Sequence, residues 1–224
     1  ISPEGMTADS STWLRIELII TMYCAASPVE TVTGYGLIYN SAAIDLKPLA
    51  PNGWTVMSDA DWAFLFDEIA TIVGANNLEA GALKSDSNEW PAFNMILGNR
   101  TLADFKALPT GYRDDEGAFL ERGTAGYWWE TGAEHNRKIK MDATMDADSH
   151  DHTTGYGYSV RLYYSGAGVP DSILTDINGN NYNVVKIGSR YYIDADYRCV
   201  TQNNGIKLEW AQSDEDWIAA EGAA

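Results

Sequence analysis

The residues best suited to chemistry crowd one polar segment near the middle of the chain. Aspartates and histidines recur there at short intervals, at Asp142, Asp146, Asp148, His150, Asp151 and His152. Carboxylate oxygens suit Ca²⁺, and histidines that alternate along an extended strand suit Zn²⁺. The spacing matches no established metal motif, so the sequence favours a solvated acidic loop. We therefore predict no metal site and no cofactor, with Ca²⁺ as a weak alternative.

A second acidic segment, from Asp176 to Asn180, superficially resembles a calcium-binding loop. Its glycine is the fourth residue, whereas an EF-hand loop requires glycine at the sixth position. We therefore interpret the segment as a turn. The β-branched run that follows, with Gly188-Ser189 before Arg190, predicts a hairpin over residues 182–193.

The sequence gives little support for catalysis by a serine nucleophile or by a cysteine thiol. The histidines His135, His150 and His152 all lie in one polar stretch, and no Gly-x-Ser-x-Gly segment presents a serine. The cysteines, Cys24 and Cys199, do not have metal-binding spacing. They form either a bridge or two buried free thiols, and the sequence leaves both alternatives open. We predict no catalytic residue.

The net charge of −17 restricts the partners. A surface this acidic repels phosphate backbones and anionic membranes, so we predict no nucleic-acid partner. No apolar run approaches the ~20 residues that span a bilayer, so we predict no membrane insertion. The chain begins at Ile1 rather than Met, which is a hint of processing.

One helix that must position these segments can be recognised from the spacing of its apolar residues. Ser58 is a suitable N-cap, and Gly74 is a suitable terminator. Between them apolar residues recur at three- and four-residue steps, at Trp62, Leu65, Phe66, Ile69 and Val73. This spacing predicts a helix over 58–73 with one buried face.

The rest of the chain predicts short strands. Residues 1–12 form a loose arm, and residues 13–23 form a strand. After Gly81 no helical period survives, so several short strands with long connections are expected. Residues 213–220 fit either a capped helical turn or an edge segment.

Several aromatic and glycine blocks follow one another in a characteristic order. They are Gly53-Trp54, Trp62, Gly111-Tyr-Arg113, Trp128-Trp129 and Gly157-Tyr-Ser-Val-Arg-Leu162. In this order they resemble the Fibrobacter succinogenes major paralogous domain family. The resemblance implies an α+β, C-type-lectin-like fold with short twisted antiparallel strands, one clear helix near 58–73 and long irregular loops.

The resemblance also implies kinship with formylglycine-generating enzymes, which use a cysteine pair in the second half of the fold. Residues 80–170 contain no cysteine, so we predict that the protein is not an enzyme.

The family segments stand in circularly permuted order. A segment like Asp176–Gly188 opens a family domain, but here it lies near the end of the chain. We therefore predict a body over 13–170 that is completed by residues 171–224. That segment folds back in cis or is donated to a neighbouring subunit, and we place the cis arrangement first.

The expected functional surface is the polar region from Glu130 to Tyr156, because family blocks bracket it and binding residues favour such loops. The predicted ligand-binding residues are Trp128, Trp129, Glu130, His135, Asn136, Asp148, His150 and His152. Tyr127, Trp128 and Trp129 cannot all share one face of a strand, so at least one points inward. A neighbour that stays exposed would be a stacking platform for a sugar ring or a partner side chain.

Other aromatic and basic residues are expected to be structural. Trp54, Trp62 and Tyr112 are assigned to the core. Arg161 lies between apolar neighbours, so we expect it to anchor a buried carboxylate or carbonyl group.

These features predict a non-enzymatic, extracellular display or adhesion module, whether secreted, on a cell surface or on a virion surface. It would recognise a surface protein or a glycan through residues 130–156. The alternative is a structural subunit of an extracellular filament or fibre, in which each chain binds the next head-to-tail by exchanging terminal strands.

Overall fold

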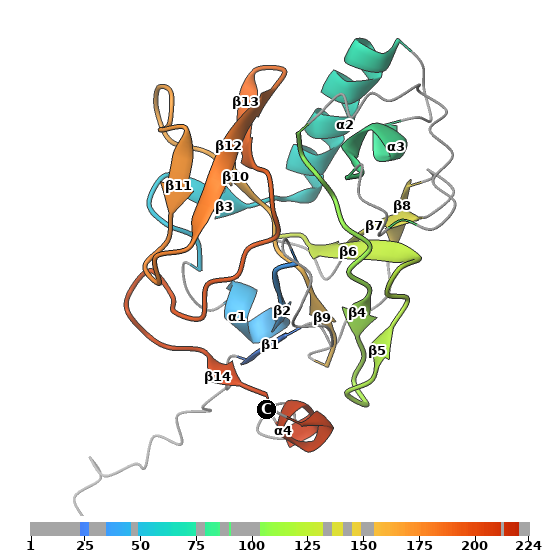
Figure 1. Ribbon diagram of the computed structural model, residues 1–224, viewed down its shortest axis with the longest axis vertical. Coiled ribbons are helices and arrows are strands. Elements are labelled where there is room, and N and C mark those ends of the chain that lie inside the picture. Colours follow the sequence, from blue (N-terminus) through green and yellow to red (C-terminus); the bar gives the residue numbers. More distant parts are fainter. Residues whose placement is uncertain are drawn as a thin grey trace, which may run out of the picture.

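Figure 1 shows the computed structural model of the chain. It describes residues 23–26, 35–45, 49–74, 79–85, 90, 104–131, 136–140, 145–148, 155–211 and 213–219. Short strands dominate and helices are few, so the fold class is α+β. The predicted arm over 1–12 and most of the predicted strand over 13–23 lie outside the described residues.

The described elements comprise helices and three sheets. The helices are α1 (Ser41–Asp45), α2 (Asp59–Val73), α3 (Glu79–Leu83) and α4 (Asp214–Ala219). In spatial order, the six-stranded sheet contains β14 (Glu209–Trp210), β1 (Tyr23–Ala26), β2 (Leu37–Asn40), β9 (Gly157–Tyr158), β4 (Tyr112–Arg113) and β5 (Phe119–Leu120). The five-stranded sheet contains β11 (Ile173–Thr175), β12 (Asn181–Ile187), β13 (Arg190–Ile193), β10 (Leu162–Tyr164) and β3 (Trp54–Val56). The three-stranded sheet contains β6 (Ala125–Trp129), β7 (Asn136–Lys140) and β8 (Met145–Asp148).

Helix α2 confirms the helix that was predicted from the spacing of apolar residues and from the capping residues Ser58 and Gly74. Ser58 and Asp61 form a reciprocal capping box, in which the Ser58 hydroxyl accepts from the Asp61 amide and the Asp61 carboxylate accepts from the Ser58 amide. Gly74 adopts the left-handed conformation and its amide donates to the Ala70 carbonyl. The predicted apolar face is buried at Trp62, Leu65, Phe66 and Ile69.

Strand β6 lies between two hydrophobic clusters. Tyr127 and Trp129 pack into the larger cluster, and Trp128, which points to the opposite face, packs into the cluster beneath α2. This is the alternation that an extended strand imposes. Every residue of β6 is buried, so both of its faces are covered.

The C-terminal segment pairs with the body of the same chain. Strand β13 pairs with β10, and β14 pairs in parallel with β1. In Figure 1 the orange strands β11, β12 and β13 lie beside β10 and β3. The hairpin predicted over 182–193 is confirmed by the pairing of β12 with β13, which closes at Ile187 and Arg190.

Arg161 has the structural role that the sequence predicted. It is fully buried and donates to the Asp196 carboxylate and to the carbonyls of Phe105, Ile193 and Lys106. Asp196 is equally buried and also accepts from the Trp128 indole at 2.7 Å. The counter-ion of the buried Arg161 therefore comes from the C-terminal segment.

Candidate functional site

The candidate segment between residues 130 and 156 is anchored where it leaves β6. The Thr131 amide donates to the Met57 carbonyl at 3.0 Å, and its hydroxyl donates to the Val56 carbonyl at 3.3 Å. These hydrogen bonds hold the chain at Thr131, just after β6, against the strand that leads into α2. The start of the segment is therefore fixed to the core.

A row of tyrosines anchors the other end, where the segment returns to β9. Tyr156 stacks on Tyr158 and on Tyr112, with ring centroids 6.3 Å and 6.1 Å apart. Tyr158 in turn stacks on Tyr127. Tyr112 and Tyr156 are only partly buried, so Tyr112 is less enclosed than the core position we predicted, whereas Trp54 and Trp62 are buried as expected.

The tyrosine row was not among the predicted site residues. Its signal is present in the sequence as the alternation Tyr156-Gly-Tyr158, which places both rings on one face of a strand. The partly exposed rings of Tyr112 and Tyr156 lie at the base of the candidate segment. They are the described aromatic groups best placed to contact something bound there.

Trp128, Trp129 and Glu130, which the sequence predicted as ligand-binding residues, are buried. Trp128 is 0% exposed, and Trp129, 4% exposed, donates its indole N–H to the Tyr39 carbonyl at 2.7 Å. Glu130 is 3% exposed. Because clusters cover both faces of β6, neither tryptophan offers a stacking platform.

Two other predicted residues come together in the three-stranded sheet. Asn136 of β7 stands opposite Asp148 of β8, and Lys138 stands opposite Asp146. Charged residues of both signs therefore occupy paired positions of the two strands. The remaining predicted residues, His135, His150 and His152, lie outside the described residues.

The turn at Asp176 is confirmed by its hydrogen bonds. One carboxylate oxygen accepts from the backbone amides of Asn178 and Asn180, each at 2.9 Å. The other accepts from the Asn180 side chain and from the Tyr182 hydroxyl, also at 2.9 Å. Burial, together with the neighbouring Asp176 charge, raises the pKa of Tyr182, so this hydroxyl remains a donor. Among the described residues, no cluster of three acidic, histidine or cysteine side chains could hold a metal ion.

Cys199 is a buried free thiol, which excludes the bridge alternative, and the Cys24 side chain lies outside the described residues. Its sulfur lies 2.8 Å from the Asn178 side-chain oxygen and 3.0 Å from the Thr201 carbonyl. Burial raises the pKa of this thiol. A buried, protonated thiol is a poor nucleophile.

Comparison with known families gives one match. The model of the Fibrobacter succinogenes major domain matches residues 11–163. The match ends within β10, so β11 to β14 and α4 lie beyond it. Searches of curated proteins and of solved structures gave no significant match. Within the described part of the chain, no helix is long and apolar enough to cross a membrane.

Proposed function

The chain belongs to the Fibrobacter succinogenes major domain family, and we propose that it is a non-enzymatic, extracellular display or adhesion module. In this proposal the body has a C-type-lectin-like fold in circularly permuted form. The recognition surface is the segment between the anchors at Thr131 and Tyr158. Its ligand is a protein or a glycan on another surface.

One observation carries the proposal: the segment leaves and re-enters the molecule at fixed points. At its start Thr131 is bonded to the strand before α2, and at its end Tyr156 and Tyr158 belong to a stacked aromatic row. A segment held this way can change in sequence without disturbing the core. That property is what a display scaffold requires.

The charge pattern favours a ligand recognised by hydrogen bonds rather than by bulk attraction. Paired positions of β7 and β8 carry both signs, as at Lys138 and Asp146. The net charge of −17 disfavours polyanions as partners. Glycans and mixed-charge protein surfaces fit this description.

A variant of the candidate segment tests the proposal. Within residues 132–154, alanine replaces the predicted binding residues His135, Asn136, Asp148, His150 and His152 together with Lys138 and Asp146, so the backbone pairing of β7 with β6 and β8 is kept. We expect binding to a glycan array and to candidate cell surfaces to fall at least tenfold, while the melting temperature changes little. The matched control replaces the exposed residues 167–169 of the β10–β11 loop. Unchanged binding by the 132–154 variant would remove this segment from the proposal.

A second candidate function is a self-assembling structural subunit that exchanges its C-terminal segment with neighbouring copies. It is favoured by the contribution of that segment beyond the family match, namely strands β11 to β13 and the Asp196 carboxylate. Size-exclusion chromatography with light scattering and electron microscopy of the full chain test it. Fibres or oligomers are expected, and a species that stays monomeric at all concentrations contradicts it.

A further inference from the structure

Among the ion pairs that join the C-terminal segment to the body, two differ greatly in character. The first attachment is the Arg161–Asp196 pair, in which both side chains are fully buried. The second attachment is the Arg113–Asp214 pair, in which Arg113 is 2% exposed but Asp214 is 63% exposed. Asp196 is fully buried, so its removal leaves the Arg161 charge buried without its partner, whereas Asp214 is mostly exposed at the surface. Of these two, only the second attachment can open without breaking the core.

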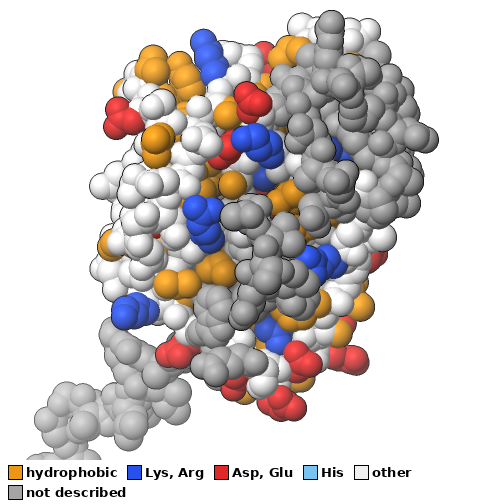
Figure 2. Space-filling view, in the orientation of Figure 1, with side chains coloured by type: hydrophobic (Ala, Val, Ile, Leu, Met, Phe, Trp, Pro, Cys, Tyr) orange, Lys and Arg blue, Asp and Glu red, His pale blue; other side chains and the backbone are white. Residues whose placement is uncertain are grey.

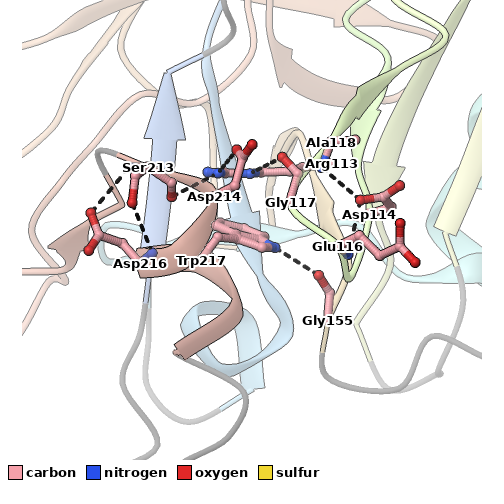
Figure 3. A network of polar contacts seen from close by, with 10 residues as sticks. All are labelled: Arg113, Asp114, Glu116, Gly117, Ala118, Gly155, Ser213, Asp214, Asp216 and Trp217. Carbon is pink, nitrogen blue, oxygen red and sulfur yellow. Dashed lines mark hydrogen bonds and ion pairs between the residues drawn. The ribbon is translucent and has the colours of Figure 1, made fainter.

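The second attachment is formed by the C-terminal latch, which we define as β14, Ala211 and α4. Figure 3 shows how α4 reaches Arg113. The Arg113 guanidinium donates to the Asp214 carboxylate at 2.8 Å and to the carbonyls of Ser213 and Gly117, both at 3.0 Å. The same guanidinium lies over the rings of Trp217 and Phe119, 4.7 Å and 4.9 Å from their centroids.

The latch fits a formed socket, which we define by Ile38, Arg113, Gly117, Phe119 and Gly157. Trp217 is 1% exposed and its indole donates to the Gly155 carbonyl at 2.8 Å. A Cβ at Gly157 would lie 2.7 Å from the Trp217 ring, and one at Gly117 would lie 2.7 Å from the Asp214 Cβ. Both glycines therefore leave the space that α4 occupies.

The latch is separate from the main cores of the molecule. Trp217 and Ala211 form a small cluster with Ile38, and Phe119 packs against it. Strand β14 adds a pairing of two positions with β1. An element with so few attachments opens more readily than the core strands.

We infer that the socket also binds the latch of a second copy of this chain, so that copies join by exchanging their latches. This inference rests on the second proposed function and narrows the exchanged part from residues 171–224 to the latch. Every socket residue is distant from the latch in sequence, so the same contacts form whichever copy supplies the latch.

The connection to the latch limits the arrangement of the two copies. The Leu208 amide is bonded to the Val200 carbonyl, which fixes the chain before the latch. From Leu208 to Ser213 an extended chain reaches at most roughly 17 Å. The exchanging copies must therefore lie side by side.

Charge sets the conditions under which exchange is expected. Figure 2 shows acidic side chains gathered at the end of the molecule where α4 and the β4–β5 turn lie in Figure 1. They include Asp214, Glu215 and Asp216 of the latch and Asp115 and Glu116 of that turn. Two such ends repel each other, so the exchanged form should increase with ionic strength.

A complementation experiment with full-length chains tests the inference. Arg113→Glu disables the socket but leaves the latch intact, and Trp217→Ala disables the latch but leaves the socket intact. Neither variant alone can join an intact latch to an intact socket. In an equimolar mixture, the latch of the Arg113→Glu chain can bind the socket of the Trp217→Ala chain. At physiological salt we expect light scattering of the mixture to reveal a species of twice the monomer mass, absent from each variant alone.

The control is the double variant Arg113→Glu/Trp217→Ala, which should stay monomeric. A mixture of the single variants that contains only monomers overturns the inference. Dimers formed by either single variant alone also overturn it, because they would not use the socket. Two copies that exchange latches can close into a dimer without forming fibres. Dimers without fibres would therefore contradict the filament proposal but support latch exchange.

A second measurement leaves the socket and Trp217 unchanged. Ile218 on α4 is 44% exposed and can carry a photo-crosslinking side chain. Unlabelled and ¹⁵N-labelled chains with this substitution are mixed, incubated and irradiated. We expect crosslinks between light and heavy peptides that join α4 to the socket, and crosslinks confined to single chains contradict the exchange.

Discussion

At the scale of single residues, Arg161 and Asp196 form a fully buried ion pair. Arg161 satisfies carbonyls of the 104–108 and 190–193 regions, and Asp196 adds the Trp128 indole to the same network. A buried charge is tolerated only when it is paired and hydrogen-bonded. This pair therefore fixes the base of the candidate recognition segment to the C-terminal segment.

We predict that Asp196→Asn destabilises the protein by about 3–5 kcal/mol, because it leaves the buried Arg161 charge without its counter-ion. Urea denaturation measures the free energy of unfolding. The control is Lys106→Ala, which removes a half-exposed cation from Asp194. Asp194 keeps its hydrogen bonds from the Asn183 amide and side chain, so the loss should be smaller than for Asp196→Asn. Equal losses for the two variants would contradict the role assigned to Asp196.

At the scale of elements, helix α2 and strand β6 work together. The Ser58 cap begins α2 and also bridges to Thr131, where the candidate segment leaves β6. Trp62 of α2 packs against Trp128 of β6, with ring centroids 5.9 Å apart. The helix start therefore positions the candidate segment as well as the core.

We predict that Ser58→Ala costs about 1 kcal/mol, because it removes the hydroxyl that accepts from the Asp61 amide. Thermal unfolding followed by circular dichroism measures the loss. Thr71→Ala is the matched control on the same helix, since the Thr71 hydroxyl is exposed and bonds only to the Asp67 carbonyl within the described structure. A loss at Thr71 as large as that at Ser58 would show that capping is not the cause.

At the scale of the whole molecule, the folding unit is longer than the family match. The match ends at residue 163, but the five-stranded sheet needs β11 to β13 and the core needs Asp196. The latch differs, because it adds only its own small cluster. We therefore expect the C-terminal region to contain one part that folding requires and one part, the latch, that can detach.

We predict that a chain ending at residue 163 does not fold, because Arg161 is then buried without Asp196 and β10 loses its partner β13. A chain ending at residue 208 should retain a cooperative thermal transition, since only the latch is removed. Near-ultraviolet circular dichroism and thermal scans compare the two. Cooperative unfolding of the shorter chain would contradict this division.

The sequence alone determined the features that depend on local pattern. The caps and period of α2, the turn at Asp176 and the hairpin at Gly188 follow from residues close together in the chain. The ordered aromatic and glycine blocks identified the family. The position of Arg161 between the apolar Val160 and Leu162 indicated that it needs a buried partner.

Only the tertiary structure decided which surfaces are covered and which groups meet. Period-two alternation separates Trp128 from Trp129, but it cannot say that elements distant in sequence bury both faces of β6. For the same reason the sequence could not identify Asp196 as the partner of Arg161, or Arg113 as the partner of the latch. Burial and ion pairing depend on contacts between remote segments, and those contacts exist only when the whole chain has packed.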